Sequence, residues 1–156
     1  MKSLFPMPSP PIITLEPLNR ANLRACVDLK VAPDQENFVA SNVYSIAQAK
    51  VEPSWYPLAI KAGDEVVGFT MYGQEIESGR WWIIRMMIGA AHQGLGYGHA
   101  AMGALIPRMA ARDGATEIRL GCVVGNDRAR RLYERYGFRD TGEVEDNEAV
   151  MLLSLA

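Results

Sequence analysis

The sequence predicts an α/β fold in which helices cover both faces of a mixed, mostly antiparallel central sheet. Segments with the apolar period of a helix alternate with β-branched, strand-like segments along residues 12–155. Three strand-like segments also follow one another in the middle of the chain, separated only by short turns, so we expect these neighbours to run antiparallel. A length of 156 residues, with 49% hydrophobic and 22% charged residues, is typical of one globular domain.

The first eleven residues differ in composition from the remainder. Four of them are prolines, which interrupt any apolar run of the kind that a signal peptide needs. We therefore expect residues 1–11 to form a loose, proline-rich arm and residues 12–156 to form a single domain. No stretch approaches the roughly 18 apolar residues that a membrane span requires, so we expect no membrane partner.

The domain is expected to begin with one strand and two helices. Residues 12–16 are typical of a strand. Asn19 is a suitable N-cap for the helix that follows, which should end before Pro33 because residues that precede proline avoid the helical region. The polar residues 34–42 are expected to be irregular. The Ser-x-x-Gln capping box at residues 45–48 predicts the start of a second, short helix.

Three strands are predicted in the middle of the chain. Residues 58–61 and 66–72 are strand-like and flank residues 62–65, which have the composition of a hairpin turn. Residues 80–88 form a longer apolar run with few polar interruptions. Such a pattern indicates a central strand that is buried on both faces of the sheet.

The last part of the chain predicts two helices among three strands. Apolar residues recur at i, i+3, i+4 and i+7 twice, at Met102, Leu105, Ile106 and Met109 and again at Ala129, Leu132, Tyr133 and Tyr136. Asn126 is placed to cap the start of the second helix, and Gly137 is placed to end it. Residues 116–124, 138–141 and 149–155 are the expected strands.

Charge is unevenly distributed along the sequence. The net charge is −2, which argues against a general nucleic-acid partner because such domains are usually basic. Residues 80–139 nevertheless carry ten arginines against four acidic residues, whereas residues 140–156 carry five acidic residues and no basic ones. This pattern suits a protein that holds an anionic ligand beside a cationic one, and it equally suits solvated surface charge without a partner.

The two cysteines, Cys26 and Cys122, lie in apolar stretches and lack the spacing of a metal site. We expect two buried, reduced thiols, which are typical of the reducing cytosol, and therefore a cytoplasmic protein without a metal.

A glycine-rich turn follows the long apolar strand. Gly94, Gly96 and Gly98 come directly before a predicted helix, so backbone amides and the positive end of the helix dipole should meet at one point. This arrangement predicts an anion site, most simply for a pyrophosphate. The segment lacks the lysine of a P-loop, and its glycine spacing does not fit the dinucleotide fingerprint. A glycine turn without a ligand remains the alternative.

Two motifs in this sequence resemble those of a known family. Gln93-x-x-Gly96-x-Gly98 resembles the Q/R-x-x-G-x-G/A signature of the GNAT superfamily of N-acetyltransferases. The second motif of that superfamily resembles Asn126-Asp127-x-Ala129-x-x-Leu132-Tyr133-x-x-x-Gly137-Phe138. The motifs occur in the family's order, and the element order over residues 12–155 is similar to the GNAT fold. Residues 36–49 are similar to the bacterial spermine/spermidine acetyltransferase branch.

The resemblance implies acetyl-CoA as cosubstrate and no metal. The backbone at the end of the strand before the turn would bind the pantetheine arm, and the amides of the turn would bind the pyrophosphate. Asn126 would contact the cofactor arm, although it also suits the role of a plain N-cap. The implied cofactor-binding residues are Met86, Met87, Ile88, Gln93, Gly94, Leu95, Gly96, Tyr97, Gly98, His99 and Asn126.

Tyr133 matches the family tyrosine that protonates the leaving thiolate, whereas its spacing alone would make it a core aromatic residue. Many GNAT members carry a glutamate on the strand before the glycine turn, but residues 81–85 contain no carboxylate. The base is therefore expected elsewhere. Glu36, Glu75 and Glu77 are candidates for the base or for substrate binding, and the alternative is that they are exposed loop charges.

The resemblance implies transfer of an acetyl group from acetyl-CoA to a primary amine of a small cationic acceptor, most directly spermine or spermidine. The amine would attack directly, without a covalent enzyme intermediate. The alternatives are another acceptor, such as an amino acid, an antibiotic or a protein N-terminus, and a non-catalytic sensor that binds acyl-CoA. The family also implies a possible homodimer.

Overall fold

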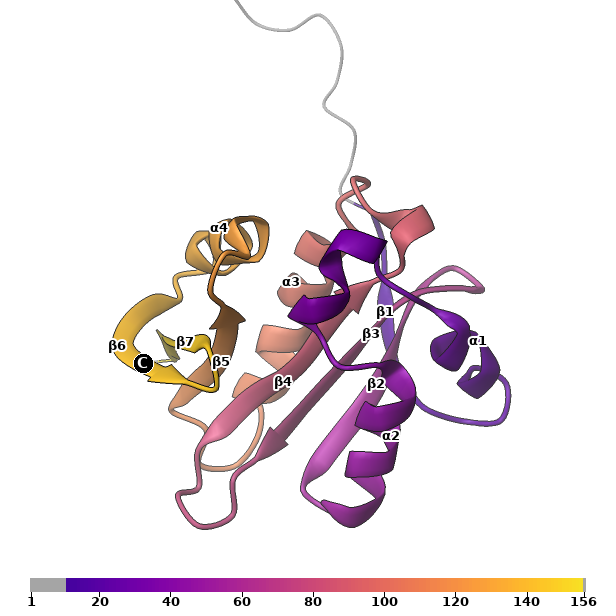
Figure 1. The fold of residues 1–156 in the computed structure, drawn as a ribbon. Helices are drawn as coiled ribbons and strands as arrows, with labels where there is room; N and C mark the ends of the chain where they lie inside the picture. The colour runs from indigo at the N-terminus through magenta and orange to yellow at the C-terminus, as the bar shows by residue number, and fades with distance from the viewer. Residues whose placement is uncertain (1–10, 156) are drawn as a thin grey trace, which may run out of the picture.

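The computed structural model describes residues 11–155 (Figure 1). The arm predicted for residues 1–11 lies outside the described residues, apart from Pro11. In chain order the elements are β1 (Thr14–Pro17), α1 (Leu23–Asp28), the 3-10 helix η1 (Pro33–Phe38), α2 (Asn42–Val51), β2 (Trp55–Ala62), β3 (Glu65–Gln74), β4 (Trp81–Ile88), the 3-10 helix η2 (Ala90–His92), α3 (Tyr97–Ala110), β5 (Glu117–Val123), α4 (Asp127–Arg135), β6 (Arg139–Glu145) and β7 (Glu148–Ser154).

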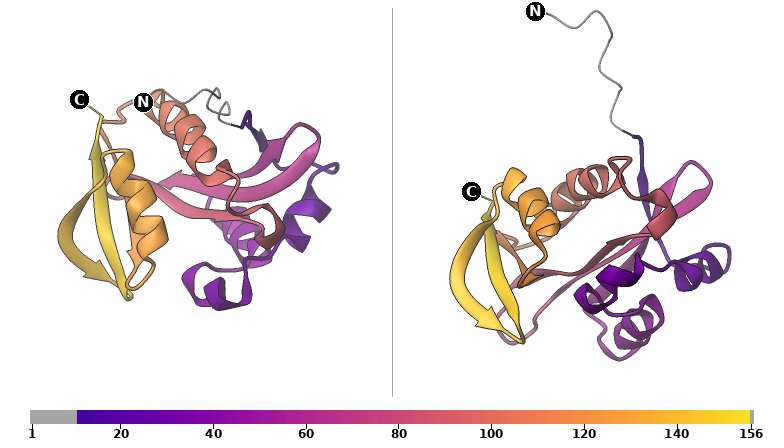
Figure 2. Two further views of the ribbon diagram at one scale, coloured as in Figure 1. Left: turned by 90° about the horizontal axis from the view of Figure 1, so that it is seen from above. Right: turned by 45° about the horizontal axis from the view of Figure 1, so that its top comes forward.

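The strands form one sheet in the order β1-β2-β3-β4-β5-β7-β6. All neighbouring strands run antiparallel except β4 and β5, which run parallel. Helices α1 and α2 cover one face of the sheet, and α3 and α4 cover the other (Figure 2). The predicted α/β class, with its mixed, mostly antiparallel sheet and helices on both faces, is therefore confirmed.

Strand β4 lies in the middle of the sheet, as its apolar sequence predicts. Its side chains Trp81 and Ile83 pack in the core beneath α3. On the opposite face, Ile84 and Met87 pack in the core beneath α1 and α2. Because both faces are covered, the strand needs apolar residues at consecutive positions.

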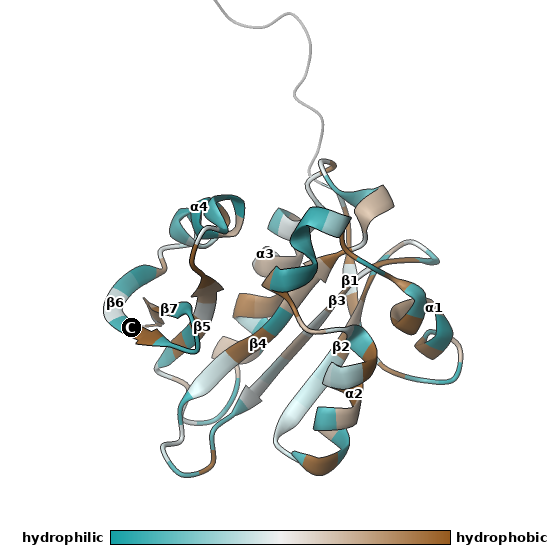
Figure 3. Cartoon of the chain, viewed as in Figure 1, coloured by the Kyte–Doolittle hydropathy of each residue, from teal (hydrophilic) through white to brown (hydrophobic). Residues whose placement is uncertain are grey.

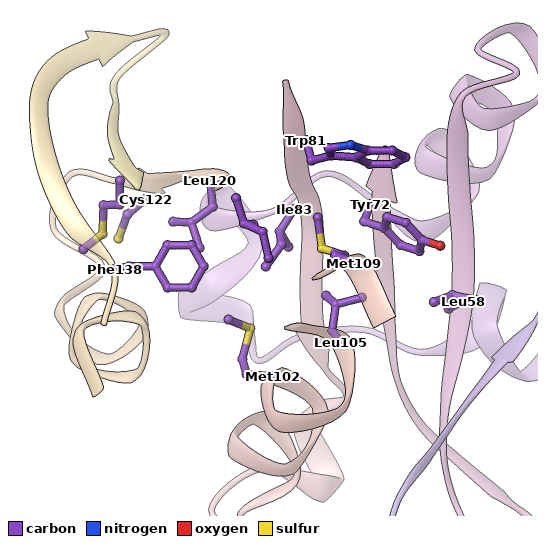
Figure 4. Packing of buried hydrophobic residues seen from close by; sticks show 12 residues of the cluster. Leu58, Tyr72, Trp81, Ile83, Met102, Leu105, Met109, Leu120, Cys122 and Phe138 are labelled. Atoms are coloured by element: carbon purple, nitrogen blue, oxygen red, sulfur yellow. The ribbon is translucent and has the colours of Figure 1, made fainter. Parts of the chain in front are cut away.

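The apolar stripe of α3 anchors this helix to the sheet. Met102, Leu105 and Met109 have no exposed surface, and they pack against sheet residues that include Ile83 and Leu120 (Figure 4). Burial of each such side chain contributes about 1.5–3 kcal/mol. The predicted stripe is confirmed, and the helix that it fixes begins at the glycine-rich turn.

Helix α4 begins and ends at the predicted residues. The Asn126 side-chain oxygen accepts a hydrogen bond from the amide of Ala129 at 3.3 Å. Gly137 has a φ of 96°, and its amide donates to the carbonyl of Glu134 at 3.0 Å. Only glycine adopts this left-handed conformation readily, so Gly137 ends the helix at low cost.

The first helix is shorter than predicted. The Asn19 side-chain oxygen accepts from the amides of Ala21 and Asn22 at 2.8 and 3.0 Å, so Asn19 does cap a turn. Regular α-helix, however, starts only at Leu23.

The predicted start of the second helix is wrong by four residues. Helix α2 begins at Asn42, and its N-cap is Ser41, whose hydroxyl accepts from the amide of Tyr44 at 3.2 Å. Ser45 is fully buried inside the helix and donates to the carbonyl of Ser41 at 3.1 Å. The preceding residues 34–42, expected to be irregular, contain most of η1.

The last hairpin is longer than predicted. Strand β6 extends to Glu145 instead of residue 141, and a two-residue turn leads directly into β7. Asp146 and Asn147 have φ values of 48° and 64°, which is the geometry of a type I′ hairpin turn. All of β6 is exposed, so no apolar alternation marks its second half.

Candidate functional site

The central feature of the site is the divergence of β4 and β5. The two strands pair only near their starts, Trp81–Ile83 against Ile118–Leu120, and they separate beyond that point (Figure 1). A register shift against β3 also leaves Ile84 without its own partner, and such a bulge bends the strand. The peptide groups along this edge of β4, from Arg85 onward, therefore face the space between the strands.

A first cavity of about 410 Å³ occupies one side of this opening. Strand β4, the N-terminus of α3 and helix α4 all contribute to it. Its lining includes Met86, Met87, Ile88, Gln93, Gly98, His99, Asn126 and Tyr133. The structure thus brings both sequence motifs to one cavity, although Gly98 at the end of the first motif and Asn126 at the start of the second are 28 positions apart.

The glycine-rich turn adopts the conformation for which its glycines are suited. Gly94 and Gly96 have φ values of 80° and 86°, where side chains other than glycine are strained. Gly96 is the N-cap of α3 and no side chain caps the helix, so the first amides of α3 have no side-chain acceptor. The predicted cofactor residues that do not line the cavity all lie in or next to this turn: Gly94, Leu95, Gly96 and Tyr97.

The Gln93 side chain ties this turn to two other elements. Its amide nitrogen donates to the carbonyl of Ile88 at 2.9 Å and to the side-chain oxygen of Gln35 at 2.7 Å. Gln35 returns a hydrogen bond of 3.1 Å from its own amide group. The end of β4, the turn and η1 are therefore fixed relative to one another. Gln35 was not identified from the sequence, because nothing local indicates a contact 58 residues away.

Three arginines of α4 add positive charge to the first cavity. Arg128, Arg131 and Arg135 line it, and their spacing of three and four residues places them along one face of the helix. Hydrophilic residues dominate α4 (Figure 3). The basic segment predicted from the charge pattern thus includes a row of guanidinium groups beside a cavity.

Tyr133 lines both the first cavity and a second one of about 530 Å³. Burial raises the pKa of its hydroxyl well above the usual range, and the charges of Cys122 and Glu148 act in the same direction. The group therefore stays protonated at neutral pH and can donate a proton or hydrogen bond into either cavity.

The second cavity lies beside the first, nearer the start of β4, where Ile83, Ile84 and Arg85 line it. It shares Met86, Gly121 and Tyr133 with the first cavity, so the two spaces meet there. Its remaining lining includes Arg85 from β4, Asp146 from the last turn and Glu148 from β7.

The charged groups of the second cavity influence one another. Desolvation raises the pKa of Glu148, the nearby Arg85 lowers it, and Asp146 raises it further. The Arg85 guanidinium is held by Gln48 at 2.9 Å and by the carbonyl of Ile84 at 2.9 Å. A fixed positive charge therefore lies close to a partly buried carboxylate.

The three carboxylates singled out in the sequence lie elsewhere. Glu36 is exposed on η1 and lines a separate cavity of about 240 Å³ beside α1 and α2. Glu75 and Glu77 are exposed in the turn between β3 and β4, and they line neither of the two cavities that meet at Tyr133. Their participation in substrate binding stays a prediction.

Both cysteines are free and buried, as the sequence predicts. Cys122 lines the first cavity, and desolvation raises the pKa of its thiol. Within residues 11–155, no group of three or more His, Cys, Asp or Glu side chains is arranged to hold a metal ion. The helices of this part of the chain are too short or too polar to cross a membrane.

Comparison with known proteins supports the same fold and a chemical class. Residues 23–138 match the "Acetyltransferase (GNAT) family". A spermine/spermidine N(1)-acetyltransferase of Bacillus subtilis (strain 168) is 31% identical over 150 residues, which cover 92% of this chain and 99% of that protein. This match confirms the resemblance to the spermine/spermidine acetyltransferase branch.

Solved structures with low sequence identity share the fold. Spermidine N-acetyltransferase from Vibrio cholerae in complex with CoA and spermine superposes with a TM-score of 0.72 at 18% identity, covering 91% of this chain and 95% of that one. An aminoglycoside acetyltransferase in complex with coenzyme A and kanamycin gives a TM-score of 0.77 at 21% identity, covering 92% and 95%.

Proposed function

The chain belongs to the GNAT acetyltransferase family, and from this premise we propose that it transfers the acetyl group of acetyl-CoA to a primary amine of a small cationic acceptor, most directly spermine or spermidine. The observation that carries the proposal is the pair of cavities that meet at Tyr133, one beside basic groups and free amides, the other beside carboxylates.

The first cavity suits the anionic cosubstrate. Its basic side chains and the uncapped N-terminus of α3 favour phosphate groups. The peptide groups of Met86, Met87 and Ile88 lie along the open edge of β4, where an extended pantetheine arm can bond to them as a neighbouring strand would. Asn126 lines the same cavity while its side chain caps α4, so both roles expected from the sequence are compatible.

The second cavity suits the amine. A primary amine with a pKa of about 10.4 is neutral in only about one part in 2,500 at pH 7, which corresponds to about 4.6 kcal/mol. The site must therefore attract the ammonium form and then remove a proton from it. Asp146 and Glu148 supply negative charge for the attraction.

The arrangement favours direct attack of the amine on the thioester. The two cavities meet, so both substrates can be held together, and the buried Cys122 remains a thiol because desolvation raises its pKa. A backbone amide at the bulge of β4 is available to stabilise the oxyanion that forms at the carbonyl. Tyr133 gives its proton to the departing sulfur and takes one from the attacking nitrogen, so its own charge does not change over the cycle.

The test is an amine panel with acetyl-CoA, in which release of free coenzyme A thiol is measured. The panel holds spermine, spermidine, a monoamine, a zwitterionic amino acid and kanamycin. We expect the polyamines to have the highest kcat/KM, by at least about tenfold. Equal turnover of the amino acid and the polyamines would contradict the acceptor class. Binding of acetyl-CoA without thiol release from any amine would contradict transfer and favour a sensor.

A further inference from the structure

The Glu148 side chain lies in a space that the neighbouring strand β5 leaves open. It is the first residue of β7 and stands opposite Val123 of β5. A β-carbon added to Gly121 on β5 would collide with the carboxylate of Glu148 and would also press on its β-carbon. Gly121 therefore provides the room in which the Glu148 side chain lies, and this explains a glycine within an otherwise apolar strand.

The carboxylate lies where the two cavities meet. Gly121, which it covers, lines both cavities, and so does Tyr133. In the described part of the chain, the Glu148 carboxylate takes part in no hydrogen bond or ion pair. Six other carboxylates form ion pairs of 3.7 Å or less. A partly buried acid without a partner, directed into a substrate cavity, is available to a ligand.

Desolvation raises the pKa of this carboxylate, and the neighbouring charges modify that shift in opposite directions. The groups that face it are Arg85 from β4, Cys122 from β5, Tyr133 from α4 and Asp146 from the turn before β7. Arg85 is anchored to Gln48 of α2 and forms no ion pair with Glu148 within 4 Å, so it stabilises the negative charge without occupying the oxygens. Desolvation opposes this effect and makes the group a stronger base than an exposed glutamate.

We propose that Glu148 is the catalytic base that takes the first proton from the ammonium group of the acceptor. The inference rests on the proposed function. One N–H bond of the ammonium breaks and an O–H bond forms on Glu148, which leaves the nitrogen lone pair free to attack the thioester carbonyl. As the C–N bond forms and the C–S bond breaks, sulfur receives the proton of Tyr133 and Tyr133 takes the second proton from the newly bonded nitrogen. Glu148 then releases its proton to water.

Asp146 is less suited to this step because it is exposed at the turn, whereas Glu148 is partly buried beside Tyr133. Asp146 lines the same cavity and adds negative charge there, which suits recognition of a cationic acceptor. The assignment thus divides the two carboxylates between proton transfer and charge recognition.

The test compares Glu148→Gln with a matched control, Glu145→Gln. Glu145 stands opposite Glu148 in the backbone register of the hairpin, and its side chain is exposed. With the best acceptor of the wild-type protein, Glu148→Gln should lower kcat by about 10²-fold or more. The acetyl-CoA Kd and the melting temperature should stay close to wild type. Glu145→Gln should retain kcat within about threefold.

Two further readouts separate a base from a structural residue. The wild-type kcat/KM should fall at low pH as the carboxylate is protonated, and this acidic limb should be absent in Glu148→Gln. A fluorinated analogue of the acceptor, whose amine is already neutral at the assay pH, should recover most of the lost kcat. Glu148→Asp keeps the charge and provides a folded comparison if the glutamine variant is unstable.

The outcomes distinguish the two proposals. Wild-type turnover with an unaffected Glu148→Gln variant, or a loss that the neutral acceptor does not relieve, would overturn the assignment of the base alone. Absence of wild-type turnover with every amine, despite bound acetyl-CoA, would overturn the proposed function and the base together.

Discussion

The proton donor of the reaction can be tested at Tyr133. Tyr133 lines both cavities, and the change Tyr133→Phe removes only its hydroxyl while keeping the ring that lies 6.1 Å from the ring of Phe138. We expect kcat to fall because the departing thiolate then receives no proton from the enzyme. Affinity for acetyl-CoA should change little, since the hydroxyl acts mainly after the substrates are bound.

The size of the loss follows from the pKa of the leaving thiol. A thiol in water has a pKa of about 8.5, so expelling it as a thiolate at pH 7 costs about 2 kcal/mol, or roughly 30-fold in rate. In this protein, burial raises the pKa of the Cys26 thiol to about 11. A sulfur that is desolvated to the same degree would cost about 5.4 kcal/mol, or roughly 10⁴-fold. We therefore expect a loss between these limits, nearer the upper one if the filled cavity excludes water.

The assay measures kcat by thiol release and the acetyl-CoA Kd by calorimetry. Tyr136→Phe is the matched control at the C-cap of the same helix. The Tyr136 hydroxyl donates to the backbone carbonyl of His99 at 2.6 Å, and Tyr136 does not line the second cavity. This control should lower stability by about 0.5–1.5 kcal/mol and leave kcat within about threefold. A Tyr133→Phe variant that keeps more than about a third of wild-type kcat would refute the assignment.

Three further changes test the turn, the core and a buried thiol. Gly96→Val introduces a β-branched residue at a φ of 86° and should weaken acetyl-CoA binding, measured by calorimetry, at least about tenfold. The control Gly63→Val lies at a φ of 61° in a distant hairpin; it should lower the free energy of unfolding by a similar amount and leave the acetyl-CoA affinity unchanged. Leu105→Ala empties a fully buried position and should lower stability by about 2–5 kcal/mol in urea unfolding; a loss below about 1 kcal/mol would contradict its place in the core. Burial raises the pKa of the Cys26 thiol to about 11, so the folded state keeps this proton at a pH where the unfolded chain loses it. The contribution of the neutral thiol to the free energy of unfolding is therefore complete below about pH 8.5 and is lost as the pH rises through 11. Cys26→Ala should therefore flatten the fall in melting temperature over this range, and an unchanged pH slope would contradict the buried thiol.

Local signals were sufficient for much of the fold. The stripe at Met102, Leu105 and Met109 and the ends of α4 at Asn126 and Gly137 depend on neighbours within a few residues, and the structure confirms them. The glycine-rich turn and the second motif could also be recognised from adjacent residues, which is why the sequence predicted an anion site at the turn.

Where two local solutions competed, the sequence could not decide between them. Ser41 and Ser45 are both plausible N-caps, and four residues separate them. The tertiary structure selects Ser41 because Asn42 and Ser45 are buried, and the Asn42 side chain donates to the carbonyl of Cys26 at 2.8 Å. The helix start is thus fixed by contact with α1, which no short window of sequence contains.

The second cavity was beyond sequence reasoning for the same physical reason. The position of Glu148 beside Tyr133 depends on the antiparallel register of β5 and β7, a pairing between segments about 25 residues apart. One signal was available, namely Gly121 inside an apolar strand, since an isolated strand glycine often marks a close approach.

The charge pattern predicted positive and negative charge side by side, and the structure places both signs beside one opening, although partly from other residues. Acidic residues in the first half of the chain were expected to receive the cationic substrate, yet Glu75 and Glu77 lie in an exposed turn away from both central cavities. The acidic C-terminal segment instead supplies Asp146 and Glu148, because pairing of β7 with β5 brings that segment beside the open edge of β4. A basic segment and an acidic segment thus become two sides of one opening, and the parallel pairing of β4 with β5, limited to three residues, is what keeps those sides apart. If the two strands paired along their full length, the ladder would occupy the peptide groups of Met86, Met87 and Ile88, which the proposed function assigns to the pantetheine arm.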